Sequence, residues 1–436
     1  MNRKILAWGL AAAGVLLLLA APVVLAASPY IMHIAIIAYF FAILASSWSL
    51  LAGYAGQFSF GHMAFMAIGA YTAGLVGKFV RLSTAPTGLC SEVKLGNYWL
   101  VLMNVGAPNC LETAKPAMPV GTLFYRLPAI HGIIFAIAMG AVFGLLVGAL
   151  VLRLRKTYLA LFTIGFSEIV RVAINAEIDL TDGPNGLQLG PLFPNGVFGF
   201  SAVDKIPPYY AMLFLFLGAM GGMYWLARSR FGLFIRALRE DEEAAAALGV
   251  HIVRYKVLVF TITSLIAAAA GAVYAHYIGV ITPNIFLIAQ MSLVIAMAVI
   301  GGLESLIAAA IGAIIIEFAL ELLRTSFSIG PLVIDMTTWR LVFFGFLLML
   351  TLRFGTTGCC NPLFSELPWV APLKKPSPSG PPQWRDRDDR TERQQHHQRF
   401  WRPAGARTGQ LQNSRPGVNR ADWPQRGRQN HPDQRP

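Results

Sequence analysis

Long apolar runs recur along this sequence and leave few folds open to it. Several of them reach or approach the roughly 20 residues that an α-helix needs to cross a lipid bilayer. Charged residues make up only 13% of the 436 residues, and the mean hydropathy is +0.56. The alternating ten-residue pattern of a membrane β-barrel is not present. We therefore predict an all-α polytopic membrane protein in which strands are not expected.

The apolar runs predict about ten transmembrane helices. Their expected ranges are 5–27, 31–52, 58–80, 127–152, 158–176, 209–228, 257–279, 286–303, 306–323 and 338–354. The first run is too long for a signal peptide and lacks a clean cleavage site, so we interpret it as a span. Basic residues beside the first span, at 153–156 and in the loop 229–256 predict that these parts face the cytoplasm.

The polar segment 81–125 falls on the opposite side of the membrane in this topology. It contains Cys90 and Cys110, which would form a disulfide in an oxidising compartment. Two free thiols are the alternative interpretation.

The net charge of +13 is not spread evenly along the chain. Residues 355–436 carry 14 Lys and Arg against 7 Asp and Glu, which leaves +6 for residues 1–354. The basic excess therefore reflects cytoplasmic loops and the tail, and it gives no indication of nucleic-acid binding.

The longest charged interruption of the apolar region is 236–249, with the sequence RALREDEEAAAALG. An acidic run followed by alanines predicts a short helix that ends at Gly249. Three residues separate Glu243-Ala244-Ala245 from this glycine. The spacing resembles the EAA loop of ABC-importer permeases, a cytoplasmic helix that docks into a cleft on the ATPase. A solvated loop between two spans is the alternative interpretation.

Three further stretches resemble the same family. Residues 51–74 read LAGYAGQFSFGHMAFMAIGAYTAG, and residues 155–175 are followed by TDGPNGL at 181–187. The third stretch runs from ITP at 281 to IGGLES at 300–305. Over about 30–354 the chain is similar to the permeases of branched-chain amino acid ABC importers, of the LivM type. It departs from the family pattern at Asp182, where a second glycine is usual.

The resemblance implies an ABC-importer permease architecture in residues 1–354 and a bacterial inner-membrane location. A periplasmic binding protein would deliver a branched-chain or other hydrophobic amino acid to a pathway formed with a second permease subunit. Two ABC ATPase subunits would bind the ATP and drive transport, so this chain would hold no cofactor or metal and would not be an enzyme. A permease for urea or short amides and an ion-coupled secondary transporter are the alternatives.

The same resemblance identifies the residues that would receive the ATPase. Glu243, Ala244, Ala245 and Gly249 match the docking motif, and Arg239 before them is a further candidate for ATPase coupling. A helix face of small residues fits closely into a groove, and the glycine permits the turn that follows it.

Polar residues within the apolar runs indicate a candidate substrate pathway. Polar groups at membrane depth are costly unless they are buried in protein or line a wet cavity, and nearby glycines suggest a broken helix. The candidates are Gly53, Tyr54, Gln57, Ser59 and His62.

Two other patterns concern structure. Glu168 and Arg171 are three residues apart, which predicts a neutralising ion pair on one helix face. Gly140, Gly144 and Gly148 form a small-residue row that would let another helix approach closely. Ordinary glycine enrichment of membrane helices is the alternative for this row.

The composition changes abruptly in residues 355–436, which predicts a disordered cytoplasmic tail. The codons offer a sharper hypothesis. Shifted by one nucleotide, Trp423-Pro424 must encode glycine, and Gln429-Asn430 must encode Lys or Arg. Permitted codons around them give G-x-x-x-x-G-K-T, the phosphate-binding loop of an ATPase. We therefore predict that the tail is a frameshifted remnant of a fused or adjacent ABC ATPase.

Overall fold

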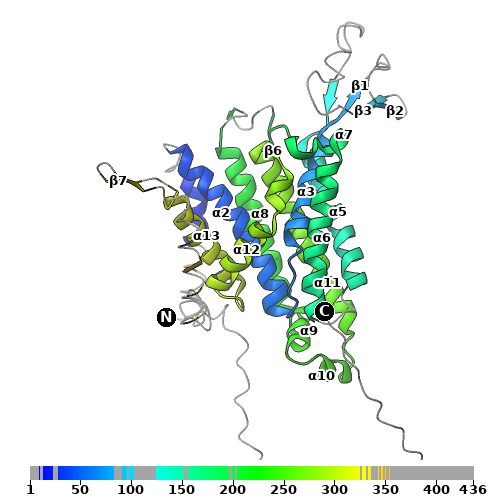
Figure 1. Ribbon diagram of the computed structural model, residues 1–436, viewed down its shortest axis with the longest axis vertical. Coiled ribbons are helices and arrows are strands. Elements are labelled where there is room, and N and C mark those ends of the chain that lie inside the picture. The colour runs from blue at the N-terminus through cyan, green and yellow to red at the C-terminus, as the bar shows by residue number, and fades with distance from the viewer. Residues whose placement is uncertain are drawn as a thin grey trace, which may run out of the picture. The chain divides into compact units, whose positions relative to one another are not determined.

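The computed structural model in Figure 1 consists mainly of apolar helices. The structure describes residues 9, 13–22, 28–82, 91–95, 98–102, 124–151, 156–194, 196, 199–201, 204–324, 327–329 and 332–334, with 342, 345, 346, 349 and 353 as isolated positions. All of them belong to Met1–Leu373, the first of two units into which the chain divides; the second is Lys374–Pro436.

Five helices of the described part are long and apolar enough to cross a membrane. Their bounds are Pro29–Tyr54, Ala129–Val151, Tyr158–Ala176, Ile206–Arg228 and Ile252–Ile278. The first consists of α2 (Pro29–Ser49) and the π-helical η1 (Leu50–Tyr54), and the third lies within α6 (Lys156–Ala176). The others are α5 (Ala129–Val151), α8 (Ile206–Arg228) and α11 (Ile252–Ile278). These five correspond to the predicted spans 31–52, 127–152, 158–176, 209–228 and 257–279.

The predicted count of ten is not confirmed. Helices α12 (Ile288–Gly301) and α13 (Leu306–Leu322) replace the spans predicted at 286–303 and 306–323, and they are bent by 118° at their junction. Gly302 at φ 129° and the capping Ser305 turn the chain sharply between them. Each helix alone is too short for a span, and only the two together are long enough for one. The described part thus holds five spans, or six if this bent pair counts as one.

Two other predicted spans are shorter than expected within the described residues. Helix α3 (His62–Gly77) has 16 residues, because the segment 55–61 before it is not helical. In the predicted first span, the described apolar helix is Ala13–Pro22, and Leu18 accepts a hydrogen bond from Tyr209 of α8 at 2.9 Å. The span predicted at 338–354 lies outside the described residues apart from isolated positions.

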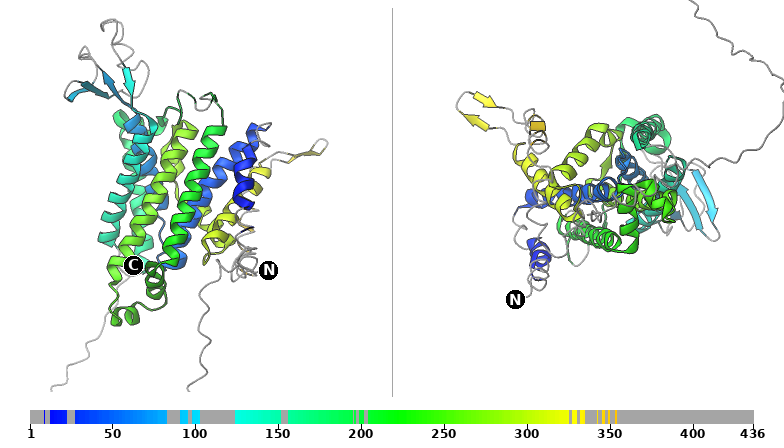
Figure 2. Two further views of the ribbon diagram at one scale, coloured as in Figure 1. Left: turned by 180° about the vertical axis from the view of Figure 1, so that it is seen from behind. Right: turned by 90° about the horizontal axis from the view of Figure 1, so that it is seen from below.

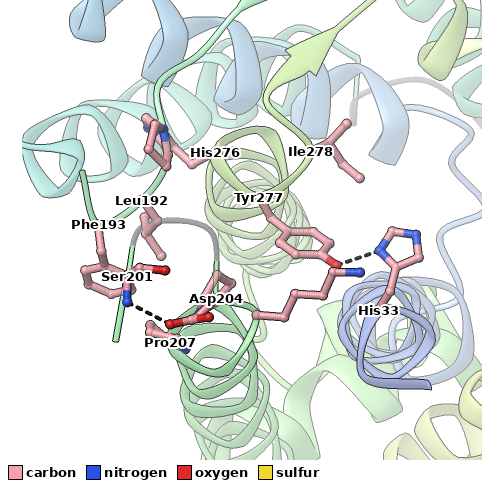
Figure 3. Close-up of a pocket in the computed structure, with 12 residues that line it drawn as sticks. His33, Leu192, Phe193, Ser201, Asp204, Pro207, His276, Tyr277 and Ile278 are labelled. Atoms are coloured by element: carbon pink, nitrogen blue, oxygen red, sulfur yellow. Dashed lines mark hydrogen bonds between the residues drawn. The ribbon is translucent and has the colours of Figure 1, made fainter. Parts of the chain in front are cut away.

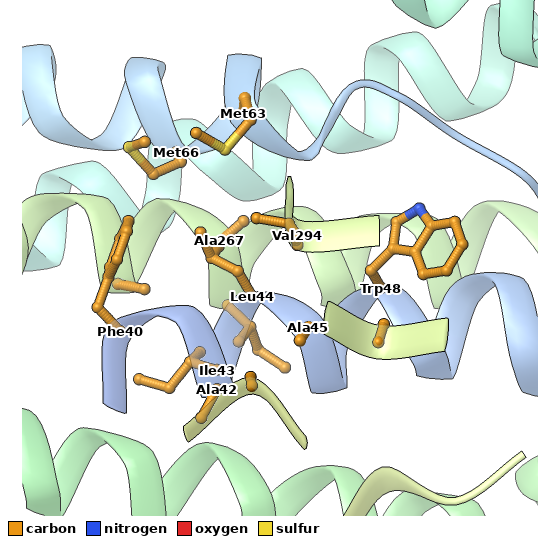
Figure 4. Close-up of a cluster of buried hydrophobic side chains, with 14 of the residues drawn as sticks. Phe40, Ala42, Ile43, Leu44, Ala45, Trp48, Met63, Met66, Ala267 and Val294 are labelled. Atoms are coloured by element: carbon orange, nitrogen blue, oxygen red, sulfur yellow. The ribbon is translucent and has the colours of Figure 1, made fainter. Parts of the chain in front are cut away.

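Helix α2 lies at the centre of the bundle, between α13, α8, α11 and α12. Figure 4 shows its large side chains Phe40, Leu44 and Trp48 packed in the buried cluster with Met63 and Met66 of α3. Trp48 is completely buried, and its indole nitrogen donates to the Ser59 carbonyl at 2.8 Å. Other helices of the chain therefore surround α2 on most of its surface.

The predicted glycine row of α5 packs within the chain. A Cβ on Gly140 would lie 2.4 Å from Cβ of Ala268, and one on Gly144 would lie 2.7 Å from Cβ of Ser264, both on α11. Small residues therefore let α5 and α11 approach closely, as the row predicts.

Strands occur where none were expected. β1 (Phe79–Leu82), β2 (Ser91–Leu95), β3 (Tyr98–Leu102) and β4 (Phe124–Arg126) form an antiparallel sheet in the order β2-β3-β1-β4, with Val80 opposite Val101 and Arg126. The sheet buries Val80, Leu82 and Val101, so short alternating runs in a polar segment were sufficient for pairing. Figures 1 and 2 place it at the end of the bundle opposite α9 and α10.

Two strand pairs complete the described structure. β5 (Leu187–Gln188) pairs with β6 (Val280–Ile281), and β7 (Phe327–Ile329) pairs with β8 (Leu332–Ile334), both antiparallel. Short helical turns α7 (Ile178–Thr181), η3 (Gly183–Asn185) and η4 (Pro283–Phe286) flank β5 and β6. The pairing of β5 with β6 connects turns that lie far apart in the sequence, whereas β7 and β8 are neighbours along the chain.

Candidate functional site

The charged segment forms two helices, α9 (Arg230–Glu240) and α10 (Glu242–Ala247). The predicted short helix that ends at Gly249 corresponds to α10, and it is separated from α9 at Asp241. This residue adopts φ −151°, and its Oδ1 accepts from the amides of Glu243 at 2.9 Å and Ala244 at 3.1 Å. Its carboxylate caps a new helix, which explains why the break falls there. The helix ends before Gly249 at φ +85°, as the sequence predicts.

Helix α10 has one face on the protein and one face open. Ala245 is buried, whereas Glu243, Ala244 and Leu248 are exposed, Leu248 with 86% of its surface. A shallow, open groove continues along residues 246 and 249–254. An ion pair of 2.7 Å between Glu242 and Lys256 connects α10 to α11. The open face is therefore presented on a helix that is held in place from behind.

Arg239 points away from this face and into the bundle. Its guanidinium donates to the Gly53 carbonyl at the end of α2 and to Oε1 of Glu304 at 2.7 Å. Glu304 lies in the turn between α12 and α13. One side chain of α9 thus joins two other segments, a role that its position in the motif did not reveal.

The end of α2 explains why the Gly53 carbonyl is free for this contact. The helix widens to the π-form at Leu50–Tyr54, and the Gln57 amide donates to Leu51 instead, at 3.0 Å. Gly53 itself has no room for a side chain, because a Cβ would lie 1.9 Å from the Leu303 carbonyl oxygen. Helix-end carbonyls lack intrahelical partners, and here a side chain from another helix provides one.

The other candidate pathway residues lie in the non-helical segment 55–61 or beside it. Gln57, Ser59 and His62 are all at least 97% buried. The amide oxygen and nitrogen of Gln57 and both ring nitrogens of His62 have no hydrogen-bond partner within the described part of the chain. Burying polar groups without partners costs free energy, so packing alone does not account for these two residues. Tyr54 differs from them, because its ring lies 4.6 Å from the Arg236 guanidinium.

Helix α6 holds the far end of this segment. The Phe60 amide donates to Oγ1 of Thr163 at 3.0 Å, and Oγ of Ser167 donates to the Phe60 carbonyl at 3.3 Å. Sequence reasoning missed both residues of α6. Their spacing of four, which places both hydroxyls on one face of the helix, was the available signal.

The predicted pair of Glu168 and Arg171 is formed. The Arg171 Nε donates to both carboxylate oxygens, at 3.1 and 3.0 Å. Both side chains are partly exposed, at 42% and 22%, so the pair lies on an outer face of α6. Cys90 and Cys110 lie outside the described residues.

The departure from the family pattern at Asp182 has a backbone explanation. Asp182 adopts φ 63°, and it is the one non-glycine residue with positive φ in the described part. Glycine adopts this region freely, and Asp is among the few other residues that tolerate it. Both glycine and Asp can therefore occupy this position, and Asp does so with some backbone strain.

A second cavity lies at the end of the bundle away from α10, with a volume of about 300 Å³ (Figure 3). His33 of α2 and Tyr277 of α11 meet there through a hydrogen bond of 2.5 Å. Asp204 accepts from the Ser201 amide at 2.7 Å, and Lys205 donates to the Pro29 carbonyl at 3.2 Å. This cavity could not be predicted from the sequence, because its residues come from four separate segments.

Comparison with known proteins identifies the family. A sequence model described as the branched-chain amino acid transport system, permease component, matches residues 30–352. The chain belongs to this family. Its members are transporter permeases rather than enzymes.

The curated relatives of this permease include transport proteins with similar names. It is 29% identical to the high-affinity branched-chain amino acid transport system permease protein LivM of Escherichia coli (strain K12) over 337 residues, which cover 70% of this chain and 68% of that protein. The probable LivM of Methanocaldococcus jannaschii is 24% identical, over 76% and 92% of the two chains. The E. coli LivH permease protein is 33% identical over 33% of this chain and 47% of its own. No solved structure matches.

Proposed function

We propose that this permease is one of two membrane subunits of an ATP-driven importer of branched-chain or other hydrophobic amino acids. A periplasmic binding protein would deliver the substrate, and two ABC ATPases would bind and hydrolyse ATP on the cytoplasmic side. The names of its relatives and of its family support the substrate class. The proposed orientation places the N-terminus and α10 in the cytoplasm, in keeping with the basic residues around them.

The observation that carries this proposal is the open face of α10. A short capped helix presents Glu243, Ala244 and the 86%-exposed Leu248 to solvent, next to an open groove. In the assembled importer we expect a groove of the ATPase to bury Leu248 and the small residues beside it. The ion pair of Glu242 with Lys256 would prevent the helix from simply yielding when it is pushed.

The docking role is tested with Leu248→Asp, Glu243→Lys and Gly249→Pro. Each variant is expected to insert in the membrane normally, to lose copurification of the ATPase, and to lose binding-protein-dependent uptake at least tenfold. Glu177→Lys is the matched control, because Glu177 is an exposed carboxylate next to α6, outside α9 and α10. Normal copurification and uptake in all three variants would refute docking at α10.

The substrate is tested by uptake into proteoliposomes of the assembled importer. We expect leucine to be taken up in preference to alanine and urea, and uptake to stop when ATP is withheld. Preferential uptake of urea would assign the chain to the alternative within the family. Uptake without ATP would point to an ion-coupled transporter instead.

We also propose that residues 355–436 are the frameshifted remnant of an ATPase gene. The forced glycine and the forced Lys or Arg under a one-nucleotide shift support this proposal. Sequencing the locus decides it, because one intact reading frame through codons 350–436 in independent isolates would exclude a shift.

A further inference from the structure

Three segments of the permease meet at Arg239, in the part of the bundle nearest to α10. They are α9, the π-helical end of α2 and the turn between α12 and α13. The guanidinium donates to the Gly53 carbonyl and to Glu304. A Cβ on Gly56, at φ +66°, would lie 3.1 Å from Cγ of Arg239, so the aliphatic part of the side chain also contacts this segment.

The turn between α12 and α13 is fastened to α2 independently of Arg239. Oγ of Ser49 donates to the Leu303 carbonyl at 2.7 Å, and Oγ of Ser46 donates to the Leu306 carbonyl at 3.1 Å. A displacement of α9 would therefore move the end of α2 and this turn together.

The segment that follows α2 is held at its other end by a different helix. Thr163 and Ser167 of α6 bind the backbone of Phe60. Gln57 lies between these two attachments and His62 lies just beyond the second, and their four polar side-chain atoms are buried without a partner among the described residues. Buried polar groups of this kind gain stability in any conformation that gives them water or a polar ligand. The present arrangement leaves these groups unpaired, and opening the segment to water or a polar ligand would stabilise them.

We propose that Arg239 transmits the displacement of α9 to the segment 55–62, and that this segment is the gate of the permease. This inference rests on the proposed docking of the ATPase at α10. Arginine suits the task because its planar fork holds a carbonyl and a carboxylate at once, which the single ammonium of lysine does less well. Arg239 is thus a positioning residue, and the gate consists of Gln57, His62 and the backbone between them.

The test uses the complete importer in proteoliposomes, with ATP hydrolysis and uptake measured on the same preparation. Arg239→Gln is expected to retain the ATPase subunits and to hydrolyse ATP within about twofold of the wild type, while uptake falls at least tenfold. Arg239→Lys should lie between the two, and Glu304→Gln should lose less, because its amide oxygen still accepts a hydrogen bond. Glu168→Gln is the control, since it breaks an ion pair of α6 that does not involve α9.

A second readout separates transmission from mere stability. In the wild type, trapping the complex with ATP and vanadate should change the hydrogen exchange of the amides in 55–62. This change should be absent in Arg239→Gln, and in Arg239→Lys if the first variant does not fold. Unchanged uptake per ATP, or a normal exchange response in the variants, would overturn the inference. Failure of the wild-type chain to bind the ATPase would instead refute the proposed docking.

A separate inference concerns the cavity at the opposite end of the bundle. Its walls include Leu192, Phe193 and Pro207, and its polar groups include Asp204 and Lys205. Asp204 is exposed, and one of its carboxylate oxygens has no hydrogen bond to the described residues, while Lys205 uses one of its three donors on Pro29. A volume of about 300 Å³ with an apolar wall and both charges suits a small zwitterion with an apolar side chain.

We infer that this cavity binds an α-amino acid with an apolar side chain on its way into the bundle. Asp204 would accept from the ammonium group, and Lys205 would donate to the carboxylate. The inference rests on the proposed substrate class and on the orientation that places this end outside the cytoplasm. It does not depend on Arg239.

Binding is measured on the purified importer without its binding protein, using radiolabelled leucine. Asp204→Asn is expected to weaken leucine binding at least tenfold and to leave the weaker binding of 4-methylpentanoate, which lacks the ammonium group, unchanged. Asp179→Asn is the control, because Asp179 is an exposed carboxylate of α7 that does not line the cavity. Equal leucine affinity in Asp204→Asn and the wild type would overturn the inference.

Discussion

Helices α2 and α6 are both apolar enough to cross a membrane, yet their surroundings differ greatly. The most apolar stretch of the span that contains α2 is 89% buried within the chain, and that of α6 is 17% buried. Helix α6 touches its neighbours through the stripe formed by Leu159, Thr163 and Ser167, and it exposes Leu161 and Ile169. A hydropathic sequence thus specifies an apolar environment, but it does not specify whether protein or lipid provides it.

The comparison also separates two ways of holding a membrane helix. Helix α2 depends on close packing, on the hydrogen bond of Trp48 and on its π-helical end, where Gly53 meets the backbone of Leu303. Helix α6 depends on a few polar contacts along one stripe. Substitutions of the same kind should therefore have opposite consequences on the two helices.

The largest difference is expected for glycine-to-alanine substitutions. Gly53→Ala places a Cβ 1.9 Å from the Leu303 carbonyl oxygen, so the backbone must shift, and the loss should be about 3 kcal/mol of folding free energy. Gly165→Ala on α6 meets nothing within 4 Å and should stabilise the helix by about 0.5 kcal/mol. Thermal unfolding in detergent, followed by size-exclusion chromatography, measures both. Equal effects would break the comparison.

A smaller difference is expected between two residues of α6 itself. Thr163→Val leaves the Phe60 amide without its partner and should cost about 1–3 kcal/mol. Leu161→Ala removes a side chain that is 63% exposed, and it should leave the stability of the isolated chain nearly unchanged. If Leu161→Ala instead disrupts the purified importer, this face of α6 contacts a second subunit rather than lipid.

The turn after α6 allows a stabilising substitution. Asp182→Gly keeps the positive φ but removes its steric strain, and it does not remove a buried side chain. The substitution should raise the free energy of unfolding by about 1 kcal/mol. The same thermal assay measures the shift. Asp182→Ala is the control, because alanine keeps the strained backbone conformation and should not stabilise.

The smallest effect concerns pH at Lys78, which follows α3 and donates to the Leu180 carbonyl at 3.0 Å. Burial lowers the pKa of Lys78 to about 8, and nearby Asp182 opposes that shift. In the unfolded chain this pKa is higher, about 10.4. Between these values the unfolded chain binds more protons, so this group makes stability rise with pH from about 8 to 10.

Removing the charged group should remove that rise. Lys78→Met is expected to have a flatter dependence of its unfolding temperature on pH across the same interval. An identical dependence in Lys78→Met and the wild type would show that other groups cause it.

Some features of the site could be predicted from the sequence alone. The spacing of Glu243 and Gly249 predicted a helix with a glycine end, and the spacing of Glu168 and Arg171 predicted their contact. Both predictions depend on residues within one or two helical turns of each other. The break at Asp241 is equally local, and the preference of Asp for the position before a helix was its available signal.

The contacts of Arg239 could not be predicted in this way. Its partners Gly53 and Glu304 are separated from it by 186 and 65 residues, and nothing in the local pattern connects them. The cavity near Asp204 and the pairing of β5 with β6 have the same character.

The apolar runs, the capped charged helix and the family motifs were determined by the sequence by itself, because hydropathy and helix periodicity act over short stretches of chain. The tertiary structure alone decided that α2 is central and α6 peripheral, that α12 and α13 bend back on each other, and that Arg239 joins three segments. The physical reason is that lipid tails and the protein interior are both apolar, so hydropathy does not determine which of them surrounds a helix. Close packing and a few polar contacts between distant residues determine how the helices are arranged.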